Sequence, residues 1–263
     1  MLVDSHCHLD AAEFDVDRAA VVERARAAGV RQQVIPAVDA SGWPKLRDIC
    51  RAETGLFPAY GLHPMFLDKH RREHLDELRE WIERERPVAI GECGLDFFAE
   101  GLDADLQHDY FEGQLGLARE FELPAIVHAR RAVDAVIAAI KRIGGPGSSP
   151  QRALRGVVHS YSGSPEQARQ LFDLGFLIGL GGPVTHERAN RLRRLAASMP
   201  LESLLLETDA PDQPDARHRG QRNEPSRLPF VCETIATLRN ADPGEIARVT
   251  SENARRLFAL PAA

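Results

Sequence analysis

Short apolar segments recur along the chain at intervals of roughly 20 to 40 residues, and each is followed by a longer stretch with helical spacing. These segments are rich in Val, Ile, Leu and Phe, which is typical of buried parallel strands. The eight strands that they predict cover residues 2–8, 33–38, 57–63, 88–92, 125–128, 156–159, 176–179 and 204–209. The clearest helices are predicted over residues 17–28, 74–84, 105–122 and 165–174.

A strand followed by a helix, eight times over in 263 residues, is typical of a (β/α)8 barrel of the TIM type. An open doubly wound sheet has the same alternation, but no GxGxxG motif follows the first strand. We therefore predict an α/β fold with one barrel domain over residues 1–263, and an active site at the C-terminal ends of the strands. A loop over 144–150 is expected at the opposite end of the barrel, and a long loop over 209–225 beside the site.

Composition and charge narrow the classes of function. The chain carries 39 acidic and 33 basic side chains, a formal net charge of −6 with its ten histidines neutral. This charge argues against a broad basic groove for nucleic acid, because such binding neutralises many phosphates. No apolar run approaches the roughly 18 residues of a membrane span, and no basic segment of the kind that begins a signal peptide precedes Asp4. We expect a cytoplasmic protein with reduced cysteines, no membrane contact and no obligate protein partner.

Residues that can bind metals stand at the predicted C-terminal ends of six strands. On the first strand, the side-chain period of two places His6 and His8 on one face. Because the strands of a parallel barrel end at one rim, these groups should converge with those of the other strands. The other strand ends carry His63, Glu92, His128, His159 and Asp209. Mixed nitrogen and oxygen ligation suits two divalent ions, with Zn²⁺, Mg²⁺, Mn²⁺ and Co²⁺ as candidates.

Each of these residues also has a simpler explanation when it is taken alone. A buried histidine is often satisfied by backbone hydrogen bonds, and an acid after a strand can cap the next helix. A set of ionisable groups at one end of a barrel is different, because burying charges without a partner is costly. Their joint placement favours a metal site.

The distribution of lysine bears on how two ions would be bridged. Barrel hydrolases with two metals often use a carboxylated lysine as the bridge, which requires a lysine at a strand end. The only lysines, Lys45, Lys69 and Lys141, fall in stretches with helical spacing. The predicted bridging ligand is therefore a carboxylate, and Glu92 is our choice.

The ordered motifs of the chain resemble those of the TatD family of metal-dependent hydrolases and deoxyribonucleases, and in particular its YjjV-like branch, within the amidohydrolase-like barrels. The resemblance covers nearly the whole chain. Its blocks are DSHCHLD at 4–10, GLHP at 61–64, GECGLD at 91–96, HAR at 128–130, VHSYSG at 158–163, ETDAP at 207–211, RNEP at 222–225 and SENAR at 251–255.

The resemblance implies two metal sites that share one carboxylate. One ion would be held by His6, His8, Glu92 and Asp209, and the other by Glu92, His128 and His159. These ligands suggest hydrolysis by a water that the ions activate. We expect Asp209 to accept the proton of that water and later to protonate the leaving group.

Further residues are candidates for roles around the ions. Glu207 shares a face with Asp209, where it could orient a ligand or pair with an arginine as a plain buried acid. Arginine forks fit phosphate oxygens, so Arg130 and Arg222 are candidate phosphate clamps, although either could equally form a surface ion pair. His63 could contact the substrate, bind the second ion or be structural. Candidate substrate-binding residues are thus His63, Arg130, Arg222 and Glu224.

Three functions remain open at this point. The family implies a deoxyribonuclease that trims DNA from an end, whereas the same site could deacylate D-aminoacyl-tRNA, and a non-catalytic metal-binding module is a remote third. Two divalent ions against Glu92 and Asp209 leave a local formal charge of about +2, because a bound ion dominates its surroundings. An acidic exterior with a cationic pocket favours gripping one phosphate or ester at a strand end.

Overall fold

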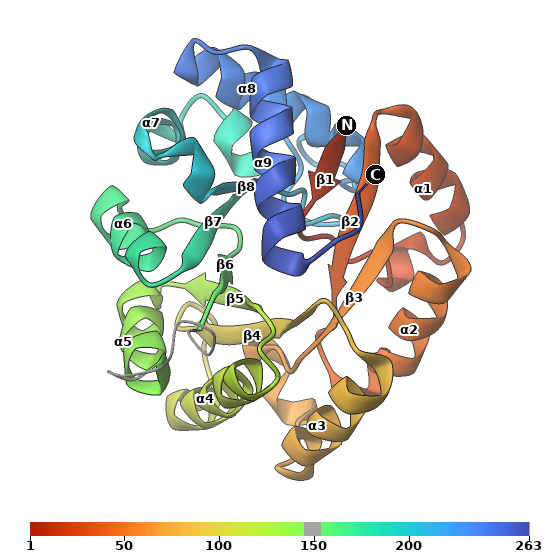
Figure 1. Ribbon diagram of the computed structural model, residues 1–263, viewed down its shortest axis with the longest axis vertical. Coiled ribbons are helices and arrows are strands. Elements are labelled where there is room, and N and C mark those ends of the chain that lie inside the picture. The colour runs from red at the N-terminus through yellow and green to blue at the C-terminus, as the bar shows by residue number, and fades with distance from the viewer. Residues whose placement is uncertain (145–153, 263) are drawn as a thin grey trace.

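The computed structural model describes residues 1–144 and 154–262 of the chain. Its sheet is parallel and runs in the order β1 to β8, with each strand beside its neighbours in the sequence. Just past β1, the amide of Ser5 donates to the carbonyl of Leu206 at the end of β8, so the two edges meet and the sheet closes (Figure 1). The predicted (β/α)8 barrel is confirmed. The strands are β1 (Leu2–Asp4), β2 (Val30–Pro36), β3 (Leu56–Tyr60), β4 (Ala89–Asp96), β5 (Ala125–Arg130), β6 (Gly156–Val158), β7 (Phe176–Leu180) and β8 (Leu204–Leu206).

Helices surround the sheet, and the four that the sequence predicts lie within two residues of their expected limits (Figure 1). No helix in the described ranges is both long and apolar enough to cross a membrane. From residue 145 on, the loop predicted over 144–150 lies outside the described residues. The helices are α1 (Arg18–Ala27), α2 (Trp43–Ala52), α3 (Glu73–Glu85), α4 (Ala104–Glu120), α5 (Val133–Gly144), α6 (Pro165–Asp173), α7 (Asn190–Ser198), α8 (Leu228–Arg239) and α9 (Pro243–Phe258).

The barrel interior is filled by one apolar residue from each strand, packed against the end of α9. From α9, this apolar cluster contains Leu257 and Phe258. Figure 1 shows α9 lying across one mouth of the barrel. The strand residues of this layer are Val3, Val34, Ala59, Ala89, Ile126, Val157, Leu177 and Leu205. The end of the barrel that α9 covers is therefore a packed core. A substrate can enter only at the opposite end, where the strands have their C-termini.

Two polar residues of the SENAR block fix α9 to the starts of the first and last strands. The hydroxyl of Ser251 accepts from the amide of Val3 at 3.2 Å. The side-chain amide of Asn253 donates to the carbonyls of Leu201 and Leu204, both at 3.0 Å. This block, noted in the sequence only as part of the family resemblance, is structural and lies at the end of the barrel opposite to the predicted site.

At the other end, several strands stop earlier than predicted. β1, expected to reach residue 8, ends at Asp4, and β8, expected to reach residue 209, ends at Leu206. The backbone then turns, since Ser160 and Asp209 take left-handed conformations with φ of 44° and 57°. The predicted ligands after β1, β6 and β8 thus lie just beyond the hydrogen-bonded ladder. Glu92 differs, because β4 continues past it to Asp96.

We predict that Asn253→Ala destabilises the fold by about 2 kcal/mol, because the carbonyls of Leu201 and Leu204 lose the amide that satisfies them inside the protein. Denaturant unfolding of the two proteins measures the difference. Glu252→Ala is the matched control on the same helix turn. It removes one exposed ion pair, with Arg248, and should cost no more than about 0.5 kcal/mol. Equal stability of the two variants would contradict this assignment.

Candidate metal centre

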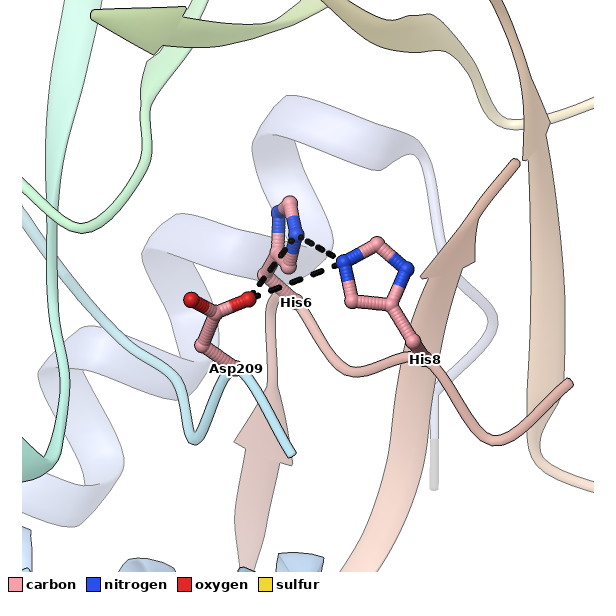
Figure 2. A group of neighbouring side chains, drawn as sticks. All are labelled: His6, His8 and Asp209. Atoms are coloured by element: carbon pink, nitrogen blue, oxygen red, sulfur yellow. Dashed lines mark hydrogen bonds and ion pairs between the residues drawn. The ribbon is translucent and has the colours of Figure 1, made fainter. Parts of the chain in front are cut away.

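The two histidines that follow β1 and the aspartate that follows β8 meet at the C-terminal mouth of the barrel (Figure 2). The Nε2 atoms of His6 and His8 are 3.1 Å apart. Asp209 Oδ1 lies 3.5 Å from the first and 3.6 Å from the second. His8 Nδ1 is 3.1 Å from the carbonyl of Pro36, an acceptor, so in the neutral ring Nδ1 carries the proton and Nε2 presents a lone pair to the cluster.

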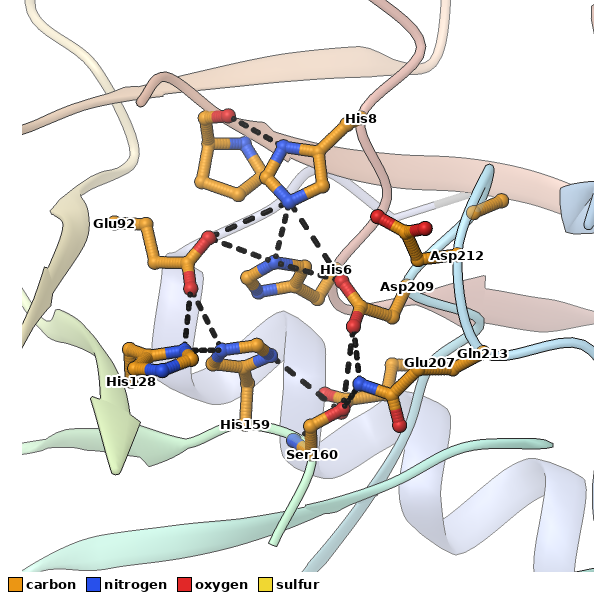
Figure 3. A network of polar contacts seen from close by, with 12 residues as sticks. His6, His8, Glu92, His128, His159, Ser160, Glu207, Asp209, Asp212 and Gln213 are labelled. Carbon is orange, nitrogen blue, oxygen red and sulfur yellow. Dashed lines mark hydrogen bonds and ion pairs between the residues drawn. The ribbon is translucent and has the colours of Figure 1, made fainter. Parts of the chain in front are cut away.

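Glu92 stands between this group and a second pair of histidines (Figure 3). Its Oε2 is 3.2 Å from His6 Nε2 and 3.4 Å from His8 Nε2. Its Oε1 is 3.3 Å from His128 Nδ1 and 2.7 Å from His159 Nε2. Each carboxylate oxygen thus faces its own set of imidazole nitrogens, as a bridging ligand requires.

The donor spacing fits divalent ions. A tetrahedral ion with bonds of about 2.0–2.1 Å holds its donors roughly 3.3 Å apart. In the first set, the distances of His6 Nε2 and His8 Nε2 from each other, from Glu92 Oε2 and from Asp209 Oδ1 run from 3.1 to 3.6 Å. Those in the second set, formed by Glu92 Oε1, His128 and His159, run from 2.7 to 3.3 Å. The structure therefore brings all six predicted ligands together, at distances that fit metal coordination.

His63 also reaches Glu92, but its hydrogen bonds distinguish it from a ligand. Its Nδ1 accepts the backbone amide of Met65 at 3.1 Å, so in the neutral ring the proton is on Nε2. Nε2 lies 3.0 Å from Glu92 Oε1 and donates to it. A nitrogen that carries a proton has no lone pair for an ion. Of the three roles open to His63, the geometry favours positioning Glu92, although its side chain also lines the pocket described below.

Two buried carboxylates lie behind the histidines, and one of them is hydrogen-bonded to a ring. Asp96 Oδ2 is 2.9 Å from His128 Nε2, and although its burial acts in the opposite direction, this hydrogen bond helps to lower the pKa of Asp96 to about 2. Glu207 Oε1 lies 3.9 Å from His159 Nδ1, and burial raises the pKa of Glu207 to about 8. No ion pair joins Glu207 to an arginine in the part of the chain that the structure describes, which removes the plain paired acid as its explanation.

Asp209 is held by two neighbours that the sequence did not single out. Its Oδ2 accepts from the hydroxyl of Ser160 at 3.3 Å and from the side-chain amide of Gln213 (Figure 3). Gln213 comes from the loop over 209–225, which was predicted beside the site. With Oδ2 fixed in this way, Oδ1 is directed at His6 and His8.

Asp4 lies on the same predicted strand face as His6 and His8 but serves the fold. Its two oxygens accept from the amide and the hydroxyl of Thr208, at 3.0 and 2.6 Å, and Oδ1 also accepts the amide of His6 at 3.2 Å. Burial raises its pKa to about 7. Asp4 therefore ties the segment before Asp209 to the segment that carries the first histidine.

The centre opens into a pocket of about 720 Å³. Arg130 lines it and makes no ion pair within the described residues. Its guanidinium carbon lies 3.8 Å from the ring centroid of Phe98, which holds the side chain at the pocket rim. Ser160, Asp212 and Gln213 complete the side nearest Asp209.

Arg222 and Glu224 are the two predicted substrate-binding residues that the structure does not bring to this pocket. Arg222 donates to both oxygens of Asp17 at 2.8 Å and to Glu224 at 3.0 Å. Glu224 is also paired with Arg24 of α1 at 2.9 Å. Both groups are used in a network that attaches the loop to α1, so the substrate-binding set that we retain excludes them.

The histidines of the metal-free centre differ in their affinity for protons. Burial lowers the pKa of His6 to about 4. Burial acts in the same direction on His8 and His159, but the carboxylate of Glu92 outweighs it and raises their pKa values to about 10 and about 9. The surrounding histidines hold the pKa of Glu92 itself well below its usual range, against the effect of its burial. At neutral pH, protons on His8 and His159 occupy the places that ions would take.

We predict that ion binding at pH 7 releases at least two protons per chain, because His8 and His159 must lose theirs to become ligands, and the pKa of His128 is raised as well. Apparent affinity should therefore rise with pH up to about 10. Titration calorimetry in buffers of different ionisation enthalpy counts the protons. His8→Gln should release about one fewer, and heats that are independent of the buffer would contradict the prediction.

We further predict that His63→Gln still binds two ions, with affinity lowered by about tenfold, because it removes a hydrogen bond to Glu92 and no ligand. The matched variant His128→Gln should retain only one ion. Metal content per chain after dialysis distinguishes the two. One ion in His63→Gln would make His63 a ligand after all.

Comparisons with known proteins agree with this arrangement. A family model described as TatD related DNase matches residues 3–259. The metal-dependent hydrolase YjjV of Escherichia coli (strain K12) is 38% identical over 262 residues, which cover 98% of each chain. A protein of Rahnella sp. (strain Y9602) named 3'-5' ssDNA/RNA exonuclease TatD is 35% identical, and the match covers 97% of each chain.

Solved structures show the same likeness in three dimensions. The crystal structure of YjjV from Escherichia coli has a TM-score of 0.93 at 37% identity, with 99% of this chain and 98% of that chain covered. An amidohydrolase from Saccharomyces cerevisiae has a TM-score of 0.83 at 18% identity, with 98% of this chain and 99% of that chain covered, and it has the same barrel fold. With a family match over nearly its whole length, the chain belongs to the TatD family of metal-dependent hydrolases.

Proposed function

We propose that this hydrolase is a TatD-type deoxyribonuclease that cleaves phosphodiester bonds at DNA ends with two divalent ions. The observation that carries the proposal is the shared carboxylate of Glu92, with one oxygen turned to each of two donor sets. Two ions bound there would lower the pKa of a water molecule and polarise the ester that it attacks. The spacing alone does not distinguish Zn²⁺, Mg²⁺, Mn²⁺ and Co²⁺.

Asp209 is the proposed proton acceptor. Gln213 and Ser160 hold Oδ2, while Oδ1 faces the donors of the first set, so the carboxylate stands at the place where a water proton would leave. The same carboxyl group can then return the proton to the departing oxygen. Glu92 positions both donor sets and is the second residue on which the chemistry depends.

On the substrate side, the proposal uses the unpaired guanidinium of Arg130 at the rim of the pocket. Arginine presents a fork of donors that matches a phosphate group. The name of the Rahnella relative supports a nucleic acid as substrate. No observation favours an aminoacyl-tRNA, which therefore enters only as a comparison in the test.

The test supplies metal-free protein with each of the four ions, together with labelled linear single-stranded DNA, circular single-stranded DNA or D-aminoacyl-tRNA. We expect shortening of the linear strand and an intact circle, because the proposed enzyme needs an end. Cleavage of the circle would contradict action at ends. Release of the amino acid from the tRNA while the DNA stays intact would mean that the enzyme hydrolyses a carboxylic ester and not a phosphodiester.

We predict that Asp209→Asn lowers the rate of DNA cleavage by at least about 100-fold, because it removes the proton acceptor, while at least one ion stays bound at the second set. Cleavage rates and metal content are measured on the same preparation. Asp105→Asn, which changes an exposed carboxylate on α4, is the control and should behave as the unaltered protein. An active Asp209→Asn would remove Asp209 from the proposed mechanism.

A further inference from the structure

A second cavity, of about 460 Å³, adjoins the metal pocket. It lies between the segment after β6, the end of β7 and the start of α7. Ser160, Ser162 and Gln213 line both cavities, so they form the wall between them. We call the second cavity the arginine groove, after the three arginines on its far side, Arg188, Arg191 and Arg194.

The charge of the groove is one-sided. No carboxylate lines it among the described residues. None of its three arginines forms an ion pair in the described ranges, whereas Arg222, beside α1, is neutralised by Asp17 and Glu224. Three uncompensated guanidinium groups in a chain with a net charge of −6 mark this cavity as a place for an anion.

The three arginines are not equivalent. Arg191 donates to the carbonyl of Ser162, so it is anchored across the groove. Arg188 and Arg194 are exposed, and the described part of the chain offers neither of them a hydrogen-bond acceptor. Their donors are therefore available to a ligand, and replacing them removes no contact that the fold uses.

The wall connects the groove directly to the proposed chemistry. Ser160 and Gln213 both bond to Asp209 Oδ2 on one side and line the groove on the other. A ligand that leaves the metal pocket past these two side chains arrives at the arginines. A nucleic acid strand that followed this path would bring its next phosphate to the arginines, because it carries a phosphate at every nucleotide.

We propose that the arginine groove binds the backbone phosphate next to the scissile one, through Arg188 and Arg194. This inference rests on the proposed function, since it assumes a nucleic acid strand in the metal pocket. Guanidinium groups pair with phosphate oxygens through two parallel hydrogen bonds, which suits a phosphodiester that must be held without regard to base sequence. The groove thereby makes the enzyme prefer a strand with several phosphates over a single dinucleotide.

The test compares the unaltered protein with the double variant Arg188→Gln/Arg194→Gln and the control Arg169→Gln. Arg169 is exposed on α6 and lines neither cavity. Binding of a fluorescent deoxyhexanucleotide to metal-free protein is followed by anisotropy across salt concentrations. The double variant should bind about tenfold or more weakly, with the slope of log affinity against log salt reduced by about 0.7 for the one lost phosphate contact. Binding equal to that of the Arg169→Gln control would overturn the proposal.

Cleavage assays separate this inference from the function on which it rests. With ions present, kcat/KM is measured for the hexanucleotide and for a dinucleotide, which has only the scissile phosphate. The double variant should lose about tenfold on the hexanucleotide and nothing on the dinucleotide. An equal loss on both, or no loss on either, would overturn the groove assignment and leave the nuclease proposal standing. If the unaltered protein cleaves neither substrate, the nuclease proposal fails first.

Discussion

The carboxylate of Glu92 is the interaction on which the functional end of the barrel depends. Only 2% of the side chain is exposed, and imidazoles from four different strand ends lie within hydrogen-bonding distance of its two oxygens or close to it. Its negative charge lets the rings of His8 and His159 hold protons at neutral pH, which their burial alone would oppose. Outer residues such as His63 and Asp96 then fix Glu92 or its partners, so the centre is organised from one side chain outward.

The two ends of the barrel are stabilised in different ways. At the α9 end, apolar side chains fill the interior, and the side-chain amide of Asn253 donates to the carbonyls of Leu201 and Leu204. At the other end, short strands release the backbone, and Ser160 and Asp209 take left-handed conformations that the regular strand would not allow. A motif that recurs in the family can therefore belong to either end, as the SENAR block shows, and its presence alone does not imply chemistry.

The ligand set could be predicted from the sequence because a parallel barrel collects strand ends at one rim, whatever the details of each turn. Asp96 could have been predicted as well, since the period of two places it on the face of Glu92. The role of His63 could not be predicted, because it depends on which ring nitrogen accepts the hydrogen bond from the amide of Met65. The choice between a phosphate clamp and an ion pair for Arg222 could not be made from the sequence, because its partner, Asp17, is 205 positions away along the chain.

The bond between Asp4 and Thr208 has a consequence for the order of events in the cell. These residues are 204 positions apart, and they hold His6 and Asp209 next to each other at the seam of the barrel. His6 and His8, which follow the first strand, are synthesised long before Asp209, the carboxylate that completes their site. The first donor set is therefore complete only when the barrel has closed. An ion bound there would link the beginning of the chain to the segment that follows its last strand.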